Sequence, residues 1–294
     1  MSLKHITHIP PANFLKAETR EGYTVSEKMK AVWAVQLDMV QKLVEVCQKH
    51  NLHIYAEGGT LLGAIRHKGF IPWDDDIDMV MMRKDFDSLM QLSHEFTHPY
   101  FLQSIYSDPH YTHRHAQLRN SETACWPVEY GKCPYKYNQG IFVDIFVADN
   151  MPITARGFSR YYKKEGLARQ KFRLVSKFTN SLPECIYTWL RNHTKTLSDK
   201  ARYAAYENVL REVPANANGY VCEISFQHSY TIESCKDYGE PQYVDFEHIK
   251  MPIPQNPTRL LALRFGDDFM TPRQAPSDHG NLDFDTDNSY TKHL

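Results

Sequence analysis

The chain has 294 residues, 42% hydrophobic and 13% aromatic, so it can bury the core of one large domain or two modest ones. Its net charge of −1 gives no general attraction for nucleic acid, and we expect no nucleic acid partner. The chain lacks a long apolar run and its N-terminus lacks a secretory pattern, so we expect a cytoplasmic protein without an integral membrane span. The cysteines form no closely spaced pairs, which disfavours a structural zinc site.

The first half of the chain alternates predicted helices and strands. Thr24 and Glu27 fit a capping box, and apolar residues at spacings of three and four predict a helix over 24–50. The other predicted elements are strands at 52–56, 76–82 and 141–147 and helices at 60–67 and 84–97. This alternation predicts an α+β fold with a mixed sheet.

The segment 151–211 is strongly basic, with 13 Lys/Arg against 4 Asp/Glu, and its pattern predicts helices. Eight of its basic residues are Arg156, Arg160, Lys163, Lys164, Arg169, Lys171, Arg173 and Lys177. They form either a solvated helix face or a surface that attracts an anionic acceptor, a nucleotide or a membrane. Residues 212–294 are rich in Pro, Gly and Asp and allow no assignment.

Three aspartates, each separated by one residue, enter an apolar segment. Asp74, Asp76 and Asp78 would share one face wherever the chain is extended, because side chains alternate along a strand. Clustered carboxylates repel one another unless a cation lies between them. We therefore expect these acids to bind one or two hard cations, with a solvated acidic turn as the alternative. A calcium loop fits poorly, because Met79 stands where such a loop needs glycine.

A single acid, Asp144, lies inside the apolar strand predicted at 141–147. A buried lone carboxylate is unfavourable unless a hydrogen-bond donor, a cationic side chain or a metal ion meets it. Asp144 is therefore a candidate third cation ligand on a neighbouring strand. The alternative is an ion pair with an arginine such as Arg119.

Two glycines link the strand predicted at 52–56 to the next helix. Glycine lets a backbone approach a ligand closely, and a helix N-terminus attracts phosphate. We expect Gly58, Gly59 and Thr60 to hold the phosphates of a donor, with Thr60 as the helix N-cap. The turn does not match a P-loop. Three following residues are expected to add positive charge for the donor, with plain solvation as the alternative: Arg66, His67 and Lys68.

Longer stretches around these motifs carry a family resemblance. Residues 58–67 read GGTLLGAIRH, residues 69–78 read GFIPWDDDID, and residues 142–146 read FVDIF. Together with stretches at 244–247, 251–254 and 260–272 they resemble the LicD family of bacterial phosphocholine transferases, which is related to the fukutin-type transferases. The resemblance is firmest at 55–87. Phe265 departs from it, because a tyrosine is usual there.

The resemblance implies a nucleotidyltransferase-like core over 1–150. Residues 151–294 would then add the helical basic segment and a C-terminal region that completes the substrate site, or the whole chain would form one continuous domain. Asp76, Asp78 and Asp144 would be catalytic and bind Mg²⁺ or Mn²⁺, with Asp74 assisting. The resemblance also implies a CDP-linked donor, commonly CDP-choline, and a glycan or lipid-linked glycan acceptor such as lipopolysaccharide or teichoic acid.

Two alternative functions are compatible with the same acids. A true nucleotidyltransferase would release pyrophosphate rather than CMP, and a non-catalytic member would bind nucleotide or glycan without turnover. The cytoplasmic enzyme expected here would make peripheral contact with the inner face of the membrane. If choline is transferred, its trimethylammonium group needs aromatic faces. The candidates, for which ordinary packing is the alternative, are Trp73, Trp126, Tyr130, Tyr135 and Tyr137.

Overall fold

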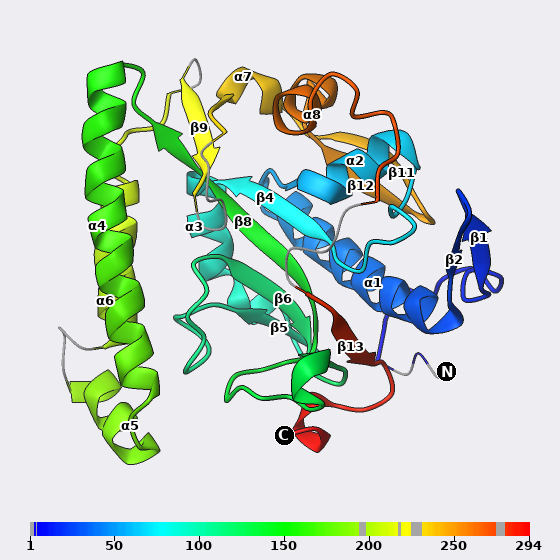
Figure 1. The fold of residues 1–294 in the computed structure, drawn as a ribbon, viewed down its shortest axis with the longest axis horizontal. Helices are drawn as coiled ribbons and strands as arrows, with labels where there is room; N and C mark the ends of the chain where they lie inside the picture. The colour runs from blue at the N-terminus through cyan, green and yellow to red at the C-terminus, as the bar shows by residue number, and fades with distance from the viewer. Residues whose placement is uncertain (1–2, 4, 194–197, 217–218, 225–230, 275–279) are drawn as a thin grey trace.

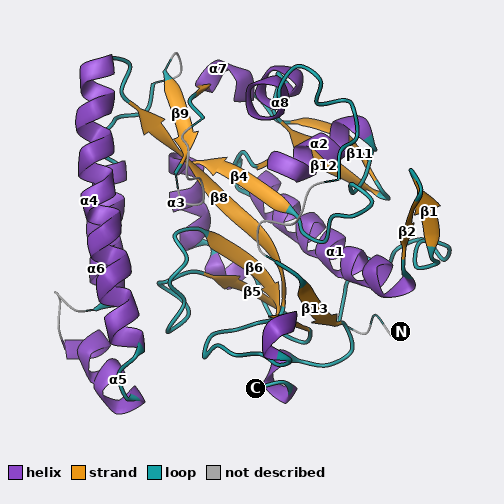
Figure 2. Cartoon of the chain, in the orientation of Figure 1, coloured by secondary structure: helices purple, strands orange, loops and turns teal. Residues whose placement is uncertain are grey.

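The computed structural model describes residues 3, 5–193, 198–216, 219–224, 231–274 and 280–294 (Figure 1). They form a mixed α+β fold, as the sequence predicts (Figure 2). The helices are α1 (Glu27–Lys49), α2 (Gly58–Arg66), α3 (Arg83–Gln91), α4 (Ala155–Asn180), α5 (Glu184–His193), α6 (Asp199–Leu210), α7 (Cys235–Tyr238) and α8 (Pro257–Phe265). The strands are β1 (Glu18–Arg20), β2 (Tyr23–Val25), β3 (Tyr55–Ala56), β4 (Asp78–Met82), β5 (Tyr100–Gln103), β6 (Ala116–Asn120), β7 (Ala124–Pro127), β8 (Ile141–Met151), β9 (Tyr220–Glu223), β10 (Glu233–Ser234), β11 (Gln242–Phe246), β12 (Ile249–Ile253) and β13 (Leu282–Asp285).

The long strand β8 organises the central seven-stranded sheet, in the order β10-β9-β8-β4-β3. β4 runs parallel to β8 along one edge, while β6 and then β9 pair antiparallel with successive stretches of the other edge. β5 extends the sheet beyond β6. The predicted domain boundary at residue 150 falls inside β8, whose last residues pair with β9.

Helix α1 forms the centre of the core, packed against β6 and β8. Its side chains Trp33, Leu37 and Met39 are fully buried. The predicted capping box is wrong: the helix begins after Ser26, whose hydroxyl accepts a hydrogen bond from the Met29 amide at 3.1 Å. Thr24 cannot cap it, because it lies in β2 and pairs with Thr19 of β1.

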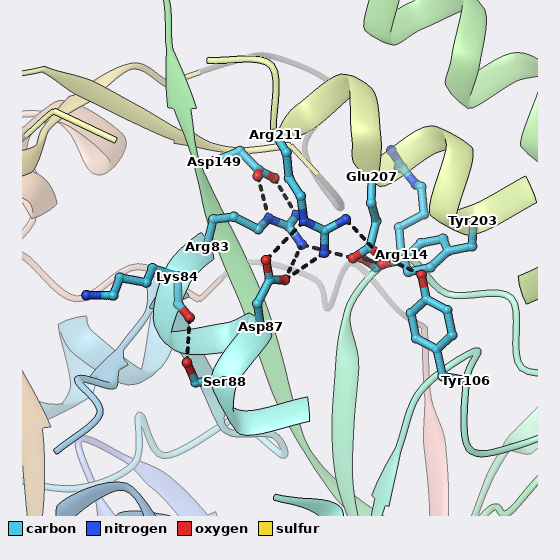
Figure 3. A network of polar contacts seen from close by, with 10 residues as sticks. All are labelled: Arg83, Lys84, Asp87, Ser88, Tyr106, Arg114, Asp149, Tyr203, Glu207 and Arg211. Atoms are coloured by element: carbon cyan, nitrogen blue, oxygen red, sulfur yellow. Dashed lines mark hydrogen bonds and ion pairs between the residues drawn. The ribbon is translucent and has the colours of Figure 1, made fainter. Parts of the chain in front are cut away.

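The basic segment forms helices α4, α5 and α6, as predicted, which gather at one end of the molecule (Figures 1 and 2). A buried ion network joins α6 to the sheet (Figure 3). The Arg83 guanidinium on α3 donates two hydrogen bonds to Asp149 of β8, at 2.7 and 2.8 Å, and one to Glu207 of α6, at 2.9 Å. Removal from water disfavours the charged arginine, but Asp149 and Glu207 outweigh this and raise the pKa of Arg83. The network therefore fixes α6 against the sheet.

The C-terminal region, residues 212–294, had no predicted secondary structure, and it contains several short strands and helices. β11 and β12 form an antiparallel hairpin, and β13 pairs with β7. Helix α8 packs against α2, the helix that follows the glycine turn. The C-terminal region therefore contacts the part of the fold that carries the predicted site.

Candidate active site

Two of the predicted acids lie directly opposite each other on neighbouring strands. In the parallel ladder between β4 and β8, Asp78 is the register partner of Asp144. The ladder is extended by one more bond, in which the Asp144 amide donates to the Ile77 carbonyl at 3.0 Å. Ile77 and Met79, on either side of Asp78, are fully buried in the core. The alternation of side chains therefore places Asp78 on the opposite face of β4 from Ile77 and Met79, as the sequence predicts.

The other acids lie in a loop rather than in the strand. The strand predicted at 76–82 begins only at Asp78, so Asp74 and Asp76 lie before it. Helix α1 holds this acidic loop from behind: the Trp33 indole donates to the Asp74 carbonyl at 3.1 Å, and the Gln36 amide donates to the Asp75 carbonyl at 2.8 Å.

The bend of this loop brings three consecutive carboxylates together. Oxygens of Asp74, Asp75 and Asp76 all lie within 4.8 Å of one another. Asp75 was not among the predicted ligands, because an extended chain would turn it to the opposite face. Carboxylate oxygens at this spacing are the ligands that Mg²⁺ and Mn²⁺ prefer.

The electrostatics of Asp78 favour a cation beside it. Burial raises the pKa of Asp78 well above its ordinary value, and the neighbouring carboxylates of Asp76, Asp144 and Asp74 raise it further. A carboxylate surrounded by others is held in its charged form only if positive charge is supplied. The all-oxygen donor set and this concentration of negative charge therefore fit a divalent cation.

Asp144 is held in its charged form by two partners on or next to β6. Burial alone would raise its pKa, but His115 and Gln117 outweigh burial and lower the pKa of Asp144. The His115 Nε2 atom lies 3.1 Å from Asp144 Oδ1, and the Gln117 amide donates to the same oxygen at 2.6 Å. Because both partners meet Oδ1, the Oδ2 atom is left for other ligands.

The arginine alternative for Asp144 is not what the structure shows. The Arg119 guanidinium instead donates to the Gln103 side chain at 2.7 Å and to the Gly140 carbonyl at 2.6 Å. His115 and Gln117 were not among the residues predicted from the sequence. Their signal was present, because polar and apolar residues alternate from His115 to Arg119 and so place the polar ones on one face of a strand.

The glycine turn faces the acids. Gly58 has a positive φ of 49°, and a Cβ built there would lie 3.8 Å from Asp78 Oδ2. A Cβ on Gly59 would lie 3.0 Å from Asp74 Oδ2. A side chain at Gly59 would therefore crowd the carboxylate, and one at Gly58 would be strained. The turn and the acids bound the same space, at the N-terminus of α2.

Thr60 has a different local role from the one predicted. Helix α2 begins at Gly58 with Glu57 as its N-cap residue, so Thr60 is not the cap. The Thr60 hydroxyl accepts a hydrogen bond from the Asp78 amide at 2.9 Å. Thr60 therefore fixes the backbone of Asp78 against the glycine turn.

The three basic residues after the turn lie at the other end of α2, about 13 Å from its N-terminus. The Arg66 guanidinium donates to the Phe269 carbonyl at 2.9 Å, and His67 Nε2 lies 3.2 Å from Glu21 Oε2. The backbone carbonyl of Lys68 accepts from the Glu247 amide at 2.8 Å. The structure therefore does not bring these residues together with Gly58 and Gly59.

A buried ion cluster supports the glycine turn from the C-terminal region. Arg264 of α8 forms ion pairs with both Glu57 and Glu233. Burial raises the pKa of Glu57 to about 7, although Arg264 lowers it. The Tyr238 hydroxyl donates to the second oxygen of Glu233. This cluster joins the residue before Gly58 to a helix more than 200 positions later in the chain.

Three of the five aromatic candidates form a connected set. Tyr135 and Tyr137 stack at 5.0 Å between ring centroids, and Tyr130 meets Tyr135 edge to face at 6.3 Å. Tyr137 contacts His113, whose ring lies 5.4 Å from His115. The other two candidates lie elsewhere: Trp126 stacks on His293, and Trp73 meets Tyr23.

The acids and the glycine turn lie in a part of the chain that is similar to known proteins. Residues 51–183 match the family model described as LicD/FKTN/FKRP, nucleotidyltransferase domain. The chain is 29% identical to the lipopolysaccharide cholinephosphotransferase LicD of Haemophilus influenzae over 206 residues, which is 69% of either chain. It is 40% identical over 82 residues to an uncharacterized protein of Rickettsia prowazekii, covering 28% of this chain and 30% of that one. The chain is thus homologous to a transferase over most of its length, and residues 51–183 match the model of the LicD/FKTN/FKRP nucleotidyltransferase domain.

Proposed function

We propose that the chain transfers phosphocholine, or a related phospho-alcohol, from a CDP-linked donor to a hydroxyl group of a cell-surface glycan, with Mg²⁺ or Mn²⁺ as cofactor. The observation that carries the proposal is the pairing of Asp78 with Asp144 beside the glycine turn. The name of the Haemophilus influenzae relative supports choline phosphate as the group transferred and lipopolysaccharide as the class of acceptor.

Different residues of the chain would bind the cation and the donor phosphates. Asp78 and Asp144, with Asp76 and Asp74 from the acidic loop, would hold the cation. A divalent ion bound there would neutralise charge on the donor phosphates. The backbone N–H groups of Gly58 and Gly59, at the start of α2, would face those phosphates.

The transfer forms one bond and breaks one. The acceptor oxygen bonds to the phosphorus that carries the alcohol, and the bond from that phosphorus to the CMP oxygen breaks, so CMP leaves with the electron pair. The hydroxyl proton passes to a base, for which Asp144 is the candidate, because its charged form is favoured by His115 and Gln117.

The connected aromatic residues support a place for the choline group. Tyr130 and Tyr135 are 51% and 40% exposed, so part of each ring is accessible to a ligand, while one face of Tyr135 stacks on Tyr137. They connect through Tyr137 and His113 to His115, which contacts Asp144. A trimethylammonium group bound on Tyr135 would therefore lie on the Asp144 side of the site.

The proposal includes a cytoplasmic location with peripheral contact at the inner face of the membrane. Among the helices that the structure describes, none combines the length and the apolar character of a membrane span.

The product of the reaction tests the proposal. The purified chain is incubated with Mg²⁺ and a panel of CDP-linked alcohols, with lipopolysaccharide or teichoic acid as acceptor. Release of CMP with phosphocholine on the acceptor is the expected result, and it should stop when EDTA is added. Release of pyrophosphate would instead identify a nucleotidyltransferase. Binding of the nucleotide without turnover in the whole panel would identify a non-catalytic member and contradict the proposal.

A further inference from the structure

The outer face of helix α4 carries an exposed apolar stripe. Leu167, Leu174 and Phe178 are 70%, 68% and 58% exposed. Their spacings of seven and four residues place them along one side of the helix. The opposite side is buried, since Tyr161 and Phe172 belong to the core that α4 shares with α6. This stripe therefore points away from the molecule, at the edge where α4 stands in Figure 1.

Positive charge borders the stripe on both sides. Helix α4 carries eight Lys/Arg and one Asp/Glu. Its acid, Glu165, is buried and lies 3.2 Å from Arg169 and 3.9 Å from Arg114. The exposed Lys163 and Lys171 each lie four residues from Leu167, so they flank the stripe within one turn. The outer face of the helix is therefore apolar along its middle and cationic along its margins.

A second pair of exposed apolar side chains follows directly in the chain. Ile186 and Trp189 on α5 are 44% and 55% exposed, and their spacing of three places them on one side of that helix. Helix α5 lies at the C-terminal end of α4 (Figure 1). Tryptophan is favoured where apolar and polar surroundings meet, as at a membrane surface.

We propose that the outer face of α4 docks on the surface of an anionic membrane. Leucine and phenylalanine side chains of a surface helix enter the boundary between headgroups and acyl chains. Lysine stems beside them lie along the apolar layer while their ammonium groups reach the anionic headgroups. A helix with this many charges lies in the plane of the surface rather than across it.

The charge pattern favours a membrane over a second copy of the chain. A symmetric dimer through this face would bring the basic margins of both copies together, and like charges oppose such a contact. Anionic lipid offers the complementary charge over the full length of the helix, which has 26 residues.

This inference deepens the proposed function, because a lipid-linked glycan acceptor would be met at a membrane surface. It rests on that function only for its biological meaning. Vesicle binding needs neither donor nor cation, so it can be measured independently of transfer.

The test measures co-sedimentation of the full chain with vesicles. Mixed phosphatidylglycerol and phosphatidylcholine vesicles should bind the chain, and pure phosphatidylcholine vesicles should bind it less. The triple variant Leu167→Ser/Leu174→Ser/Phe178→Ser should lose affinity for the anionic vesicles by about tenfold or more, since three apolar side chains no longer enter the surface. Ile9→Ser is the matched control, because Ile9 is 84% exposed outside α4 and should bind as the wild type does.

Two double charge-reversal variants test the electrostatic contribution to membrane binding. Lys163→Glu/Lys171→Glu should weaken binding to anionic vesicles, and Lys16→Glu/Lys132→Glu, with the same change in net charge at exposed positions elsewhere, should weaken it much less. Circular dichroism and CMP release with a water-soluble acceptor fragment should be unchanged in the α4 variants. Failure of the wild type to bind anionic vesicles, equal binding by the triple variant, or a dimer that dissociates in that variant would overturn the proposal. Loss of CMP release in all forms with vesicle binding intact would count against the proposed function alone.

Discussion

Asp78 of β4 and Asp144 of β8 are register partners in a parallel strand pair, although 66 positions separate them in the sequence. Both lie next to fully buried core residues, so their backbones are fixed by the sheet. Their partners differ: carboxylates surround Asp78, whereas His115 and Gln117 contact Asp144. The sheet therefore holds the two acids side by side. The pKa of Asp78 is raised, whereas the pKa of Asp144 is lowered.

Replacing Asp78 should separate activity from stability. Asp78→Asn removes a carboxylate whose pKa is raised by burial and by Asp76 and Asp144. We expect CMP release to be lost while the melting temperature in EDTA rises by about 2–4 °C, because like-charge repulsion is relieved. Asp245→Asn is the control, because this acid is 70% exposed and should change neither quantity. A marked fall in the melting temperature of Asp78→Asn would contradict this reasoning.

His115 should act by orienting Asp144. His115→Ala removes the contact to Asp144 Oδ1 at 3.1 Å and leaves Gln117 as its partner. Loss of such a supporting contact lowers metal affinity or activity by about 10–100-fold. We expect a reduction of this size in both kcat and Mn²⁺ affinity. His110→Ala is the control, since His110 pairs with Glu184, and unchanged Mn²⁺ affinity in His115→Ala would refute the role.

The stability of the metal-free chain should fall as pH rises from about 4.5 to 7. The pKa of Glu57 is raised from 4.5 to about 7, first of all by burial, so the folded state keeps a proton there that the unfolded chain has lost. Stability is therefore full below 4.5 and declines toward 7, by at most about 1.4 kcal/mol per pH unit for one group.

The decline should be smaller in Glu57→Gln, measured by urea unfolding in EDTA at several pH values. Glu184→Gln should keep the wild-type slope, because Lys136 lowers the pKa of Glu184 to about 2 and its titration lies below this window. A wild-type slope in Glu57→Gln would show that Glu57 is ionised throughout.

Replacing Arg264 should lower the free energy of unfolding more than replacing Arg259, which lies on the same helix. Arg264→Ala leaves Glu57 and Glu233 buried without their shared cation, which costs about 3–5 kcal/mol of unfolding free energy. Arg259 is 69% exposed, and Arg259→Ala should cost less than about 1 kcal/mol. Equal effects in chemical denaturation would mean that the cluster does not support the glycine turn.

The sequence predicted the helices and strands that have a clear local pattern. It also predicted the acids that lie within apolar segments. The alternation of Ile77, Asp78 and Met79 indicated a strand with Asp78 on the other face from its apolar neighbours, and β4 begins at Asp78 between these two buried residues. The start of α1 was misplaced because Thr24 satisfies a capping pattern locally, while pairing with Thr19 decides its conformation.

The residues that the sequence analysis missed act across long separations. His115 and Gln117 lie on or next to β6, and only its antiparallel register with β8 brings them to Asp144. Asp75 joins the acidic cluster in a loop whose backbone accepts hydrogen bonds from Trp33 and Gln36 of α1. Arg264 reaches Glu57 from a region whose composition allowed no assignment. Tertiary contacts of this kind leave no periodic signal in the local sequence.

Binding of Mn²⁺ to the wild type, Asp78→Asn and Asp144→Asn, measured by electron paramagnetic resonance of the free ion, tests the central claim most directly. If acids from β4 and β8 share one cation, the wild type binds Mn²⁺ in competition with Mg²⁺, and each variant loses at least about tenfold in affinity. Wild-type affinity in Asp144→Asn would contradict the claim, since the ion would then belong to the loop of Asp74, Asp75 and Asp76 alone.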